Sequence, residues 1–433
     1  MSDCEHEHEN ETYDVAGVGF GPSNLALAIA LEERPAEAAG GPLRAVFLER
    51  QPAFGWHRNM LLPSVTMQVS FLKDLATFRN PASKFSFVSF LHDSGRLPRF
   101  VNNQDFFPTR REFHQYLEWA EARLARRPSY GAEVSRIRLA PTAAGRADRL
   151  EIEVRDAVSG ASRLVRARNV VVSTGLVPRM PADTERDERV WHSSEFLEKY
   201  CRMDPAQLRS VAVVGAGQSA AEITRFLYDE LPHAQVWAVI PSYGYSTADD
   251  TPFANQIFDP AAVDDYYFGT PQAREAFWKY HRNTNYGVVD DDVISGLFRR
   301  AYDDDVRGVK RLNVLNLTRV TDVKRSGSET RVSLSGRIGS GLTELDVDAL
   351  VCATGYGPME PAGLLGELEP YCLRDEAGRY RVERDYRICA PELQCGIYLQ
   401  GGTEHTHGLS ASLLSNIAVR SGEIVESIAA RRS

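Results

Sequence analysis

The sequence predicts an α/β protein that contains two Rossmann-like dinucleotide-binding units. Two glycine-rich turns carry this prediction, because one follows an apolar strand near residue 19 and the other follows a second strand near residue 215. The third observation is a pair of apolar strands that end in Thr174-Gly175 and in Thr354-Gly355. A chain of 433 residues is long enough for two or three domains of ~100–200 residues each.

The first turn lies in the stretch YDVAGVGFGPSNLALAIALEE, residues 13–33. Glycines let the backbone turn tightly, and the first N–H groups of the following helix can then face a phosphate. The three glycines are Gly17, Gly19 and Gly21. Pro22 suits the first helical position, where no donor is needed. The next strand, residues 43–50, ends in Glu49, where an acid commonly binds a ribose. A purely structural turn is the alternative to a dinucleotide site.

The second turn has the same design and lies in the segment LRSVAVVGAGQSAAEITRFLYDEL, which begins at residue 208. A β-branched strand leads into Gly215-x-Gly217-x-x-Ala220, and an amphipathic helix follows. One such site fits any dehydrogenase. Two sites indicate one tightly held and one exchangeable dinucleotide, which is the plan of a flavoprotein that a nicotinamide reduces.

The two Thr-Gly turns indicate how the domains are arranged, because such turns carry the chain between domains in two-dinucleotide flavoproteins. We expect an FAD domain split between residues 1–195 and 340–433, and an NADPH domain at residues 196–339 inserted between its parts. Residues 250–300 are expected to form a substrate-binding insertion. The C-terminal part is expected to contribute to both the substrate and the flavin sites.

Composition excludes several classes of protein. A net charge of −9 and a pI of 5.7 argue against a nucleic-acid partner, which requires a basic face. The six cysteines show neither a disulfide framework nor C-x-x-C spacing, so we expect reduced thiols in a cytoplasmic protein and no disulfide reductase. No run of apolar residues is long enough for a membrane span, and the polar N-terminus predicts no targeting signal.

These exclusions leave the oxidation of a small substrate by dioxygen as the simplest use of the electrons that the nicotinamide passes to the flavin. The segment that follows the flavin strand, LPSVTMQVSFLKDLATFRNPASKFSFVSFL, combines aromatic residues with Gln68 and Lys73. Lys73 is either a ligand for a substrate carboxylate or a surface lysine whose stem covers apolar side chains. Spacing alone does not decide between these two interpretations.

Nine motifs together resemble one family, the microbial N-hydroxylating flavin monooxygenases, and in particular the L-ornithine N-monooxygenases. The motifs are GVGFGPSNLALA, FGWH, MQVSFLKDL, FPTRREFHQYLEWA, VVGAGQSAAE, DDTPFANQIFDP, NTNYGVVD, CATGY and HTHGLSASLLS, and they cover nearly the whole chain. The middle segment, TPFANQIFDP followed by NTNYGVVD, resembles the ornithine rather than the lysine branch.

The resemblance implies which residues contact each cofactor. The residues implied for FAD are Gly17, Gly19, Gly21, Pro22, Glu49, Trp56, His57, Met67, Gln68, Thr354 and Leu413. Those implied for NADPH are Gly215, Gly217, Gln218 and Ser219. Tyr286 is implied to flank the site of the nicotinamide and the substrate amine, as a further cofactor-binding residue. The family uses no metal, so the resemblance implies no metal ligand.

For the substrate, the resemblance implies that Lys73 and Asn255 bind the amino-acid head of ornithine and that Ser410 closes the site. Asn285 is expected to lie near the side-chain amine and the nicotinamide and, with Gln68, to act in catalysis. For Asn255 and Asn285, an Asx-type turn is the alternative.

The implied chemistry is N-hydroxylation by a flavin C(4a)-hydroperoxide, with NADPH and O₂ consumed, in siderophore or related peptide biosynthesis. The implied assembly is a homotetramer. Lysine or a diamine such as putrescine is an alternative substrate. A flavoprotein that only oxidises NAD(P)H is an alternative of another class.

One segment departs from the family pattern. Relatives carry an arginine for the NADPH 2′-phosphate shortly after the second strand of the nicotinamide domain. Here no Arg or Lys occurs between Val239 and Phe253. Either hydroxyls such as Ser242 and Tyr243 act with a more distant cation, or the preference for NADPH is weak. We expect the second outcome, with NADH tolerated.

Overall fold

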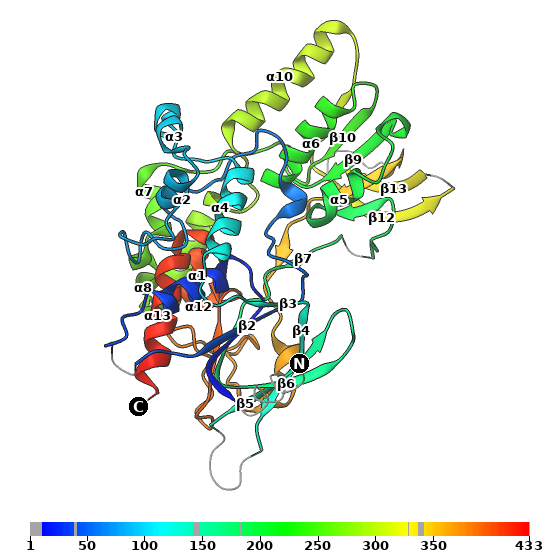
Figure 1. Cartoon of the computed structure of the whole chain (residues 1–433). Coiled ribbons are helices and arrows are strands. Elements are labelled where there is room, and N and C mark those ends of the chain that lie inside the picture. Colours follow the sequence, from blue (N-terminus) through cyan, green and yellow to red (C-terminus); the bar gives the residue numbers. More distant parts are fainter. Residues whose placement is uncertain are drawn as a thin grey trace.

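The computed structural model describes residues 11–38, 41–141, 148–181, 183–327, 329–336 and 342–432. Two β-sheets form the two halves of the molecule, one below the other in Figure 1, and helices cover both. Both turns predicted from the sequence lie where a parallel strand meets a helix. The fold is therefore the predicted one, a Rossmann-like dinucleotide-binding domain with a second Rossmann-like domain inserted into it.

The larger sheet has seven strands in the order β3-β2-β1-β6-β5-β4, with β17 also paired to β6. The neighbours β3, β2, β1, β6 and β17 run parallel, whereas β6, β5 and β4 form an antiparallel meander. The strands are β1 (Thr12–Val18), β2 (Ala45–Glu49), β3 (Ser129–Tyr130), β4 (Ala132–Leu139), β5 (Leu150–Asp156), β6 (Ser162–Val172) and β17 (Gly396–Leu399).

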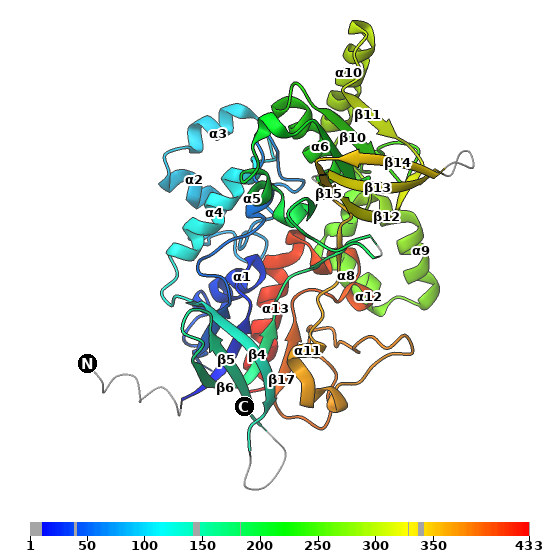
Figure 2. The ribbon, with the colours of Figure 1, turned by 90° about the vertical axis from the view of Figure 1, so that its right-hand side faces the viewer.

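Helices α1 (Pro22–Glu32) and α13 (Ile417–Ala430) lie side by side against one face of this sheet (Figure 2). Residues 24–30 of helix α1 are all buried, and Leu25, Leu27 and Ile29 are 0% exposed, so this part of the helix packs inside the core. Three further helices complete this core: α2 (Phe87–Asp93), α3 (Leu97–Asn103) and α4 (Arg110–Ala122).

The smaller sheet is wholly parallel, with five strands in the order β11-β10-β9-β15-β8. One face packs on helices α5, α6 and α10, and the other packs on the antiparallel sheet β12-β13-β14. The elements are β8 (Val190–His192), α5 (Phe196–Tyr200), β9 (Ser210–Val214), α6 (Gln218–Glu230), β10 (Gln235–Val239), α10 (Asp291–Arg307), β11 (Leu312–Leu315), β12 (Thr318–Ser326), β13 (Glu329–Gly336), β14 (Leu342–Val347) and β15 (Ala349–Cys352).

The chain crosses between the domains at a two-stranded antiparallel pair, β7 (Val177–Pro178) and β16 (Tyr356–Gly357). Strand β8 precedes residue 195 and β15 follows residue 340, yet both belong to the smaller sheet. We therefore propose domain boundaries near residues 177 and 356 in place of 195 and 340. Apolar spacing could not show the difference, because it does not reveal which strands pair.

Three helices leave the smaller sheet between β10 and α10: α7 (Pro252–Asn255), α8 (Pro260–Phe268) and α9 (Pro271–His281). Helix α8 packs against α12 (Glu404–His407), so the insertion contacts the C-terminal part of the chain (Figure 2). Helix α11 (Ala362–Leu365) packs near β4. In the described part of the chain, no helix is both long enough and apolar enough to cross a membrane.

His407 makes the stability of this C-terminal part depend on pH. The imidazole is 1% exposed, stacks on Tyr386 and lies 3.1 Å from the Arg384 carbonyl oxygen. Burial lowers its pKa from 6.5 to about 3. Below pH 6.5 the unfolded chain takes up a proton that the folded chain does not, so unfolding becomes easier as the pH falls.

We predict that His407→Gln removes this dependence. Between roughly pH 7 and pH 5, the free energy of unfolding of the variant should fall less steeply than that of the native chain, by up to about 1.4 kcal/mol per pH unit. Chemical denaturation at several pH values measures this slope. His233→Gln, at an exposed histidine, is the control. Parallel pH profiles for the native chain and the His407 variant would contradict the assignment.

Candidate active site

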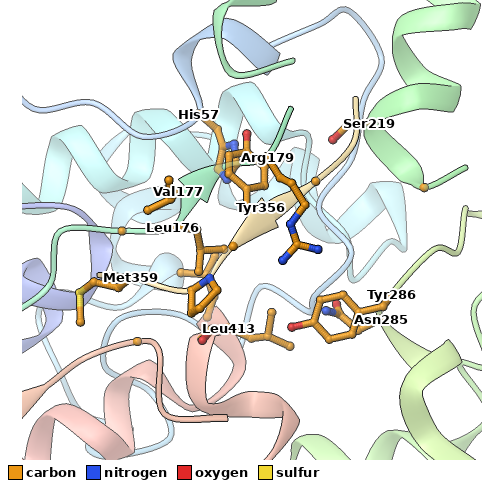
Figure 3. A pocket seen from close by; sticks show the side chains of 18 of the residues that line it. His57, Leu176, Val177, Arg179, Ser219, Asn285, Tyr286, Tyr356, Met359 and Leu413 are labelled. Carbon is orange, nitrogen blue, oxygen red and sulfur yellow. The ribbon is translucent and has the colours of Figure 1, made fainter. Parts of the chain in front are cut away.

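A connected cavity of about 4060 Å³ lies at the carboxyl ends of the parallel strands of both sheets. Its wall includes both glycine-rich turns, the two Thr-Gly turns and residues of the insertion. Common small-molecule pockets measure roughly 300–1,000 Å³. The cavity therefore has room for more than one ligand, and part of its wall is drawn in Figure 3.

The first glycine-rich turn is shaped by its close contacts. Gly19 has a φ of +81°, and a Cβ there would lie 2.4 Å from the Ser173 carbonyl oxygen, so no other residue fits. Gly21 faces open space, and Pro22 begins α1 without a side-chain cap. Gly17, in contrast, lies inside β1, and its missing Cβ makes room for the Phe47 ring. Gly17 therefore serves packing and does not line the cavity.

Glu49 connects this turn to the end of β2. The backbone N–H of Phe20 donates to its Oε2 at 2.6 Å, and the N–H of Gln51 donates to its Oε1 at 2.8 Å. The carboxylate lines the cavity and retains lone pairs for further donors. It can thus hold the turn and accept from ribose hydroxyls at the same time.

The second turn repeats the design with different contacts. Gly215 has a φ of +145°, and a Cβ there would lie 2.3 Å from the Ala353 carbonyl oxygen and 3.1 Å from the Ala220 Cβ. Helix α6 begins at Gln218 after Gly217, again without a side-chain cap. In both turns the first N–H groups of a helix open toward the cavity, and this arrangement fits two dinucleotide pyrophosphates.

The residues expected beside the isoalloxazine, Trp56, His57, Met67 and Gln68, all line the cavity. Thr354 and Leu413, the other residues expected to contact the flavin, line it as well. His57 lines the cavity (Figure 3), and desolvation lowers its pKa to about 4, with Arg110 and His114 adding to the effect. Its imidazole is therefore neutral at pH 7. The Thr354 hydroxyl donates to the Arg179 carbonyl oxygen, so it supports the crossing between the domains.

A chain of hydrogen bonds joins the two domains at the cavity wall. Gln68 Nε2 donates to Asp290 Oδ1 at 3.0 Å, and Gln218 Nε2 donates to Asp290 Oδ2 at 2.7 Å. Gln218 Nε2 also lies 2.9 Å from Glu222 Oε1, and Glu222 forms a bidentate ion pair with Arg110. Burial raises the pKa of Asp290, and the amide donors oppose that shift.

Sequence reasoning missed the functional position of Asp290, Glu222 and Arg110. All three lie inside the motifs that carried the family resemblance: NTNYGVVD, VVGAGQSAAE and FPTRREFHQYLEWA. Their presence in these motifs was the sequence signal that could have identified them. Their contacts join residues far apart in the chain, and spacing within one motif does not reveal such contacts.

Lys73 is a cation inside the cavity. Burial lowers its pKa, and the Asp259 charge opposes that shift. Its Nζ lies 5.4 Å from the centroid of the Phe258 ring. No carboxylate lies within ion-pair distance of Lys73 among the described residues. A half-buried ammonium without such a partner fits an anionic group of a ligand.

Asn255 and Asn285 also line the cavity, on the side of the insertion. Asn255 Nδ2 donates to the Asp250 carbonyl oxygen at 2.6 Å, so a local turn forms and Oδ1 remains an acceptor for a ligand. Asn285 and Tyr286 follow a short 3₁₀ turn, and Figure 3 shows both on the cavity wall. The Tyr286 hydroxyl donates to Glu404, a contact that joins the insertion to the C-terminal part of the chain.

Ser410 does not share this wall. It is 2% exposed, accepts a hydrogen bond from Asn416 Nδ2 at 2.8 Å and is not among the cavity-lining residues. Glu404 and Ser412 line the cavity in this region instead. The predicted role of Ser410 in closing the substrate site therefore has no support in this geometry.

Two sheets whose parallel strands lead into glycine-rich turns on one cavity are typical of the two-dinucleotide flavoproteins. The particular family follows from comparison with known proteins. The family model described as L-lysine 6-monooxygenase/L-ornithine 5-monooxygenase matches residues 11–358, and the chain belongs to this family.

Individual relatives are similar over nearly the full length. The L-ornithine N(5)-monooxygenase of Burkholderia cepacia is 40% identical over 97% of this chain and 94% of the relative. The structure of Kutzneria sp. 744 ornithine N-hydroxylase with reduced FAD, NADP⁺ and L-ornithine is 61% identical, with a TM-score of 0.94 over 98% of this chain and 100% of that chain. The cadaverine monooxygenase of Erwinia amylovora is 27% identical, with a TM-score of 0.85 over 97% of this chain and 95% of that chain.

The first turn predicts different outcomes for two neighbouring substitutions. Gly19→Ala introduces a clash with Ser173 at a positive φ, so it should lower both the melting temperature of the FAD-free chain and its FAD content. Gly21→Ala meets no protein atom, so it should lower FAD affinity and leave the melting temperature of the FAD-free chain nearly unchanged. Thermal unfolding and flavin absorbance measure the two effects. Equal behaviour of the two variants would contradict this account of the turn.

Proposed function

We propose that this chain hydroxylates the side-chain nitrogen of L-ornithine, with bound FAD, NADPH as reductant and O₂ as co-substrate. The amine, O₂, NADPH and one proton give the N-hydroxylated amine, water and NADP⁺. The observation that carries the proposal is the half-buried Lys73 cation in the cavity, because it suits a substrate carboxylate. The names of the 40% and 61% identical relatives support the same substrate.

When bound, FAD accepts a hydride from NADPH and activates O₂ for transfer of one oxygen atom. The protein positions the amine and keeps water out. In the proposed complex, the Lys73 ammonium pairs with the substrate carboxylate and Asn255 Oδ1 accepts from the α-ammonium. Asn285 orients the side-chain amine. The amine must be neutral to attack oxygen, and desolvation in the cavity lowers its pKa from about 10.4, so no separate base is required.

The alternative functions keep the N-hydroxylation reaction and differ in the amine that serves as substrate. The cadaverine monooxygenase of Erwinia amylovora is named for a diamine without a carboxylate. In this chain, a diamine would leave the Lys73 charge unpaired in the cavity, which is costly. Lysine keeps the carboxylate but adds one methylene, and a pocket discriminates such a difference by roughly 10- to 200-fold.

The test compares L-ornithine, L-lysine and putrescine in the FAD-loaded protein. NADPH consumption and hydroxylamine product are quantified in parallel. We expect product in step with NADPH consumption for ornithine alone. NADPH oxidation without hydroxylated product for every amine would contradict the proposal and indicate an NAD(P)H oxidase instead.

Replacing Lys73 separates recognition of the carboxylate from the chemistry. We predict that Lys73→Met raises KM for ornithine roughly 30- to 1,000-fold, as expected when a charge-assisted pair worth about 2–4 kcal/mol is lost. Its effect on any putrescine turnover should be less than about threefold. Lys84→Met, at an exposed lysine away from the cavity, is the control. Equal losses for ornithine and putrescine would contradict the pairing.

We further propose that the enzyme acts in the cytoplasm in siderophore or related peptide biosynthesis, and that it assembles as a homotetramer. Free cysteines support a reducing compartment. Helix α10, at the top of Figure 1, carries exposed apolar residues at a spacing of four: Phe298, Tyr302 and Val306 are 73%, 64% and 67% exposed. Such a stripe supports contact with a second copy of the chain.

A charge within this stripe should weaken the assembly. We predict that Phe298→Glu lowers the molar mass measured by light scattering from that of a tetramer to that of a dimer or monomer. Val158→Glu, which places the same charge at a 95% exposed residue elsewhere, is the control. Retention of the tetramer in the Phe298 variant would contradict this interface.

A further inference from the structure

The missing arginine after β10 leaves open how the chain recognises the 2′-phosphate of NADPH. In a Rossmann unit, the residue that contacts the ribose 2′ position lies at the end of the second strand. Here that strand is β10, and the residues after it, Ile240, Pro241 and Ser242, carry no charge. No acid at the strand end therefore repels a 2′-phosphate, but no cation in the adjoining loop attracts one.

The two hydroxyl groups of this loop, those of Ser242 and Tyr243, are not placed to bind the 2′-phosphate. Ser242 Oγ donates its hydrogen to the Gly244 carbonyl oxygen at 2.7 Å, and a phosphate needs a donor. Tyr243 is 73% exposed, and neither residue is among those that line the cavity. The cation must therefore come from another segment of the chain.

The start of β12 lies directly against the end of β10. The N–H of Thr318 donates to the Ile240 carbonyl oxygen at 2.9 Å, and the N–H of Leu317 donates to the Ser242 carbonyl oxygen at 2.8 Å. The next residue, Arg319, lines the cavity, as does Pro241 from the loop. Two backbone hydrogen bonds thus fix Arg319 at the edge where the ribose 2′ position is expected.

Arg319 is also available to bind an anion. Among the described residues, no carboxylate or carbonyl oxygen pairs with its guanidinium, whereas Arg325 on the same strand forms an ion pair with Asp187. Ser219, in the first turn of α6, lines the same cavity, and its side chain has no hydrogen-bond partner in the described part of the chain. A guanidinium and a hydroxyl are suitable donors for a phosphate.

We propose that Arg319, with Ser219, binds the 2′-phosphate of NADPH and gives this chain its preference for NADPH over NADH. This inference rests on the proposed function, because it assigns the second glycine-rich turn to NADPH. It replaces the expectation of a weak preference. The cation that relatives place directly after the second strand is supplied here from a strand that lies beside it in space.

The test measures binding of two fragments to the FAD-loaded full chain by titration calorimetry. The fragments are 2′,5′-ADP, which carries the 2′-phosphate, and 5′-AMP, which lacks it. We expect Arg319→Ala to weaken 2′,5′-ADP binding roughly 10- to 100-fold and 5′-AMP binding less than about twofold. Arg319→Lys should lose less, and Arg325→Ala, which removes the same charge from the same strand outside the cavity, should change neither.

Two results would overturn the inference. One is a loss of 2′,5′-ADP affinity in Arg319→Ala no larger than in Arg325→Ala. The other is equal affinity of the native chain for both fragments, because there would then be no 2′-phosphate recognition to assign. Fragment binding does not require hydroxylation, so failure of the proposed ornithine activity would leave this test intact. Flavin absorbance and the melting temperature confirm that each variant is folded.

Discussion

The active site depends on the buried contacts that hold the two nucleotide domains together. The Glu222 side chain is fully buried and pairs with Arg110, whose side chain is 12% exposed. Removing one partner of such a pair costs about 3–5 kcal/mol, because the other charge remains buried. Asp290 adds a second connection, since Gln68 and Gln218 donate to its two carboxylate oxygens from different domains. These contacts connect the two domains at the wall of the cavity that they share.

The fold was predictable from the sequence where local geometry leaves no choice. Gly19 and Gly215 each have a positive φ and a carbonyl oxygen within 2.5 Å of a would-be Cβ, so the motif reports a real steric constraint. Gly17 matched the same motif for another reason, namely the close approach of the Phe47 ring. A motif thus predicts where glycine is required, and only the structure separates ligand contact from packing.

The rest of the site depends on contacts between distant segments, which spacing does not reveal. The position of Lys73 in the cavity, without a carboxylate partner among the described residues, supports the proposal that it binds a substrate carboxylate, which is one of the two interpretations that its sequence context allowed. Ser410 shows the limit of assigning roles from a family resemblance one residue at a time. Its hydroxyl oxygen accepts a hydrogen bond from Asn416 Nδ2, and the residue is not among those that line the cavity. The domain boundaries and the role proposed for Arg319 depend on knowing which strands pair. Strands β8 and β15, from the two ends of the inserted segment, join the same sheet.

The Arg110–Glu222 pair and the Asp290 contacts hold the nicotinamide domain against the flavin domain. Anaerobic reduction of bound FAD by NADPH is the most direct test of this claim. Rapid mixing follows the loss of flavin absorbance before O₂ and the amine take part. In Asp290→Ala, we expect the rate of FAD reduction to fall at least about tenfold, the effect of losing roughly 1.4 kcal/mol of positioning, with FAD content unchanged. Asp303→Ala, at an exposed position on helix α10, which begins directly after Asp290, should reduce FAD at the native rate. A native rate in the Asp290 variant would contradict the claim.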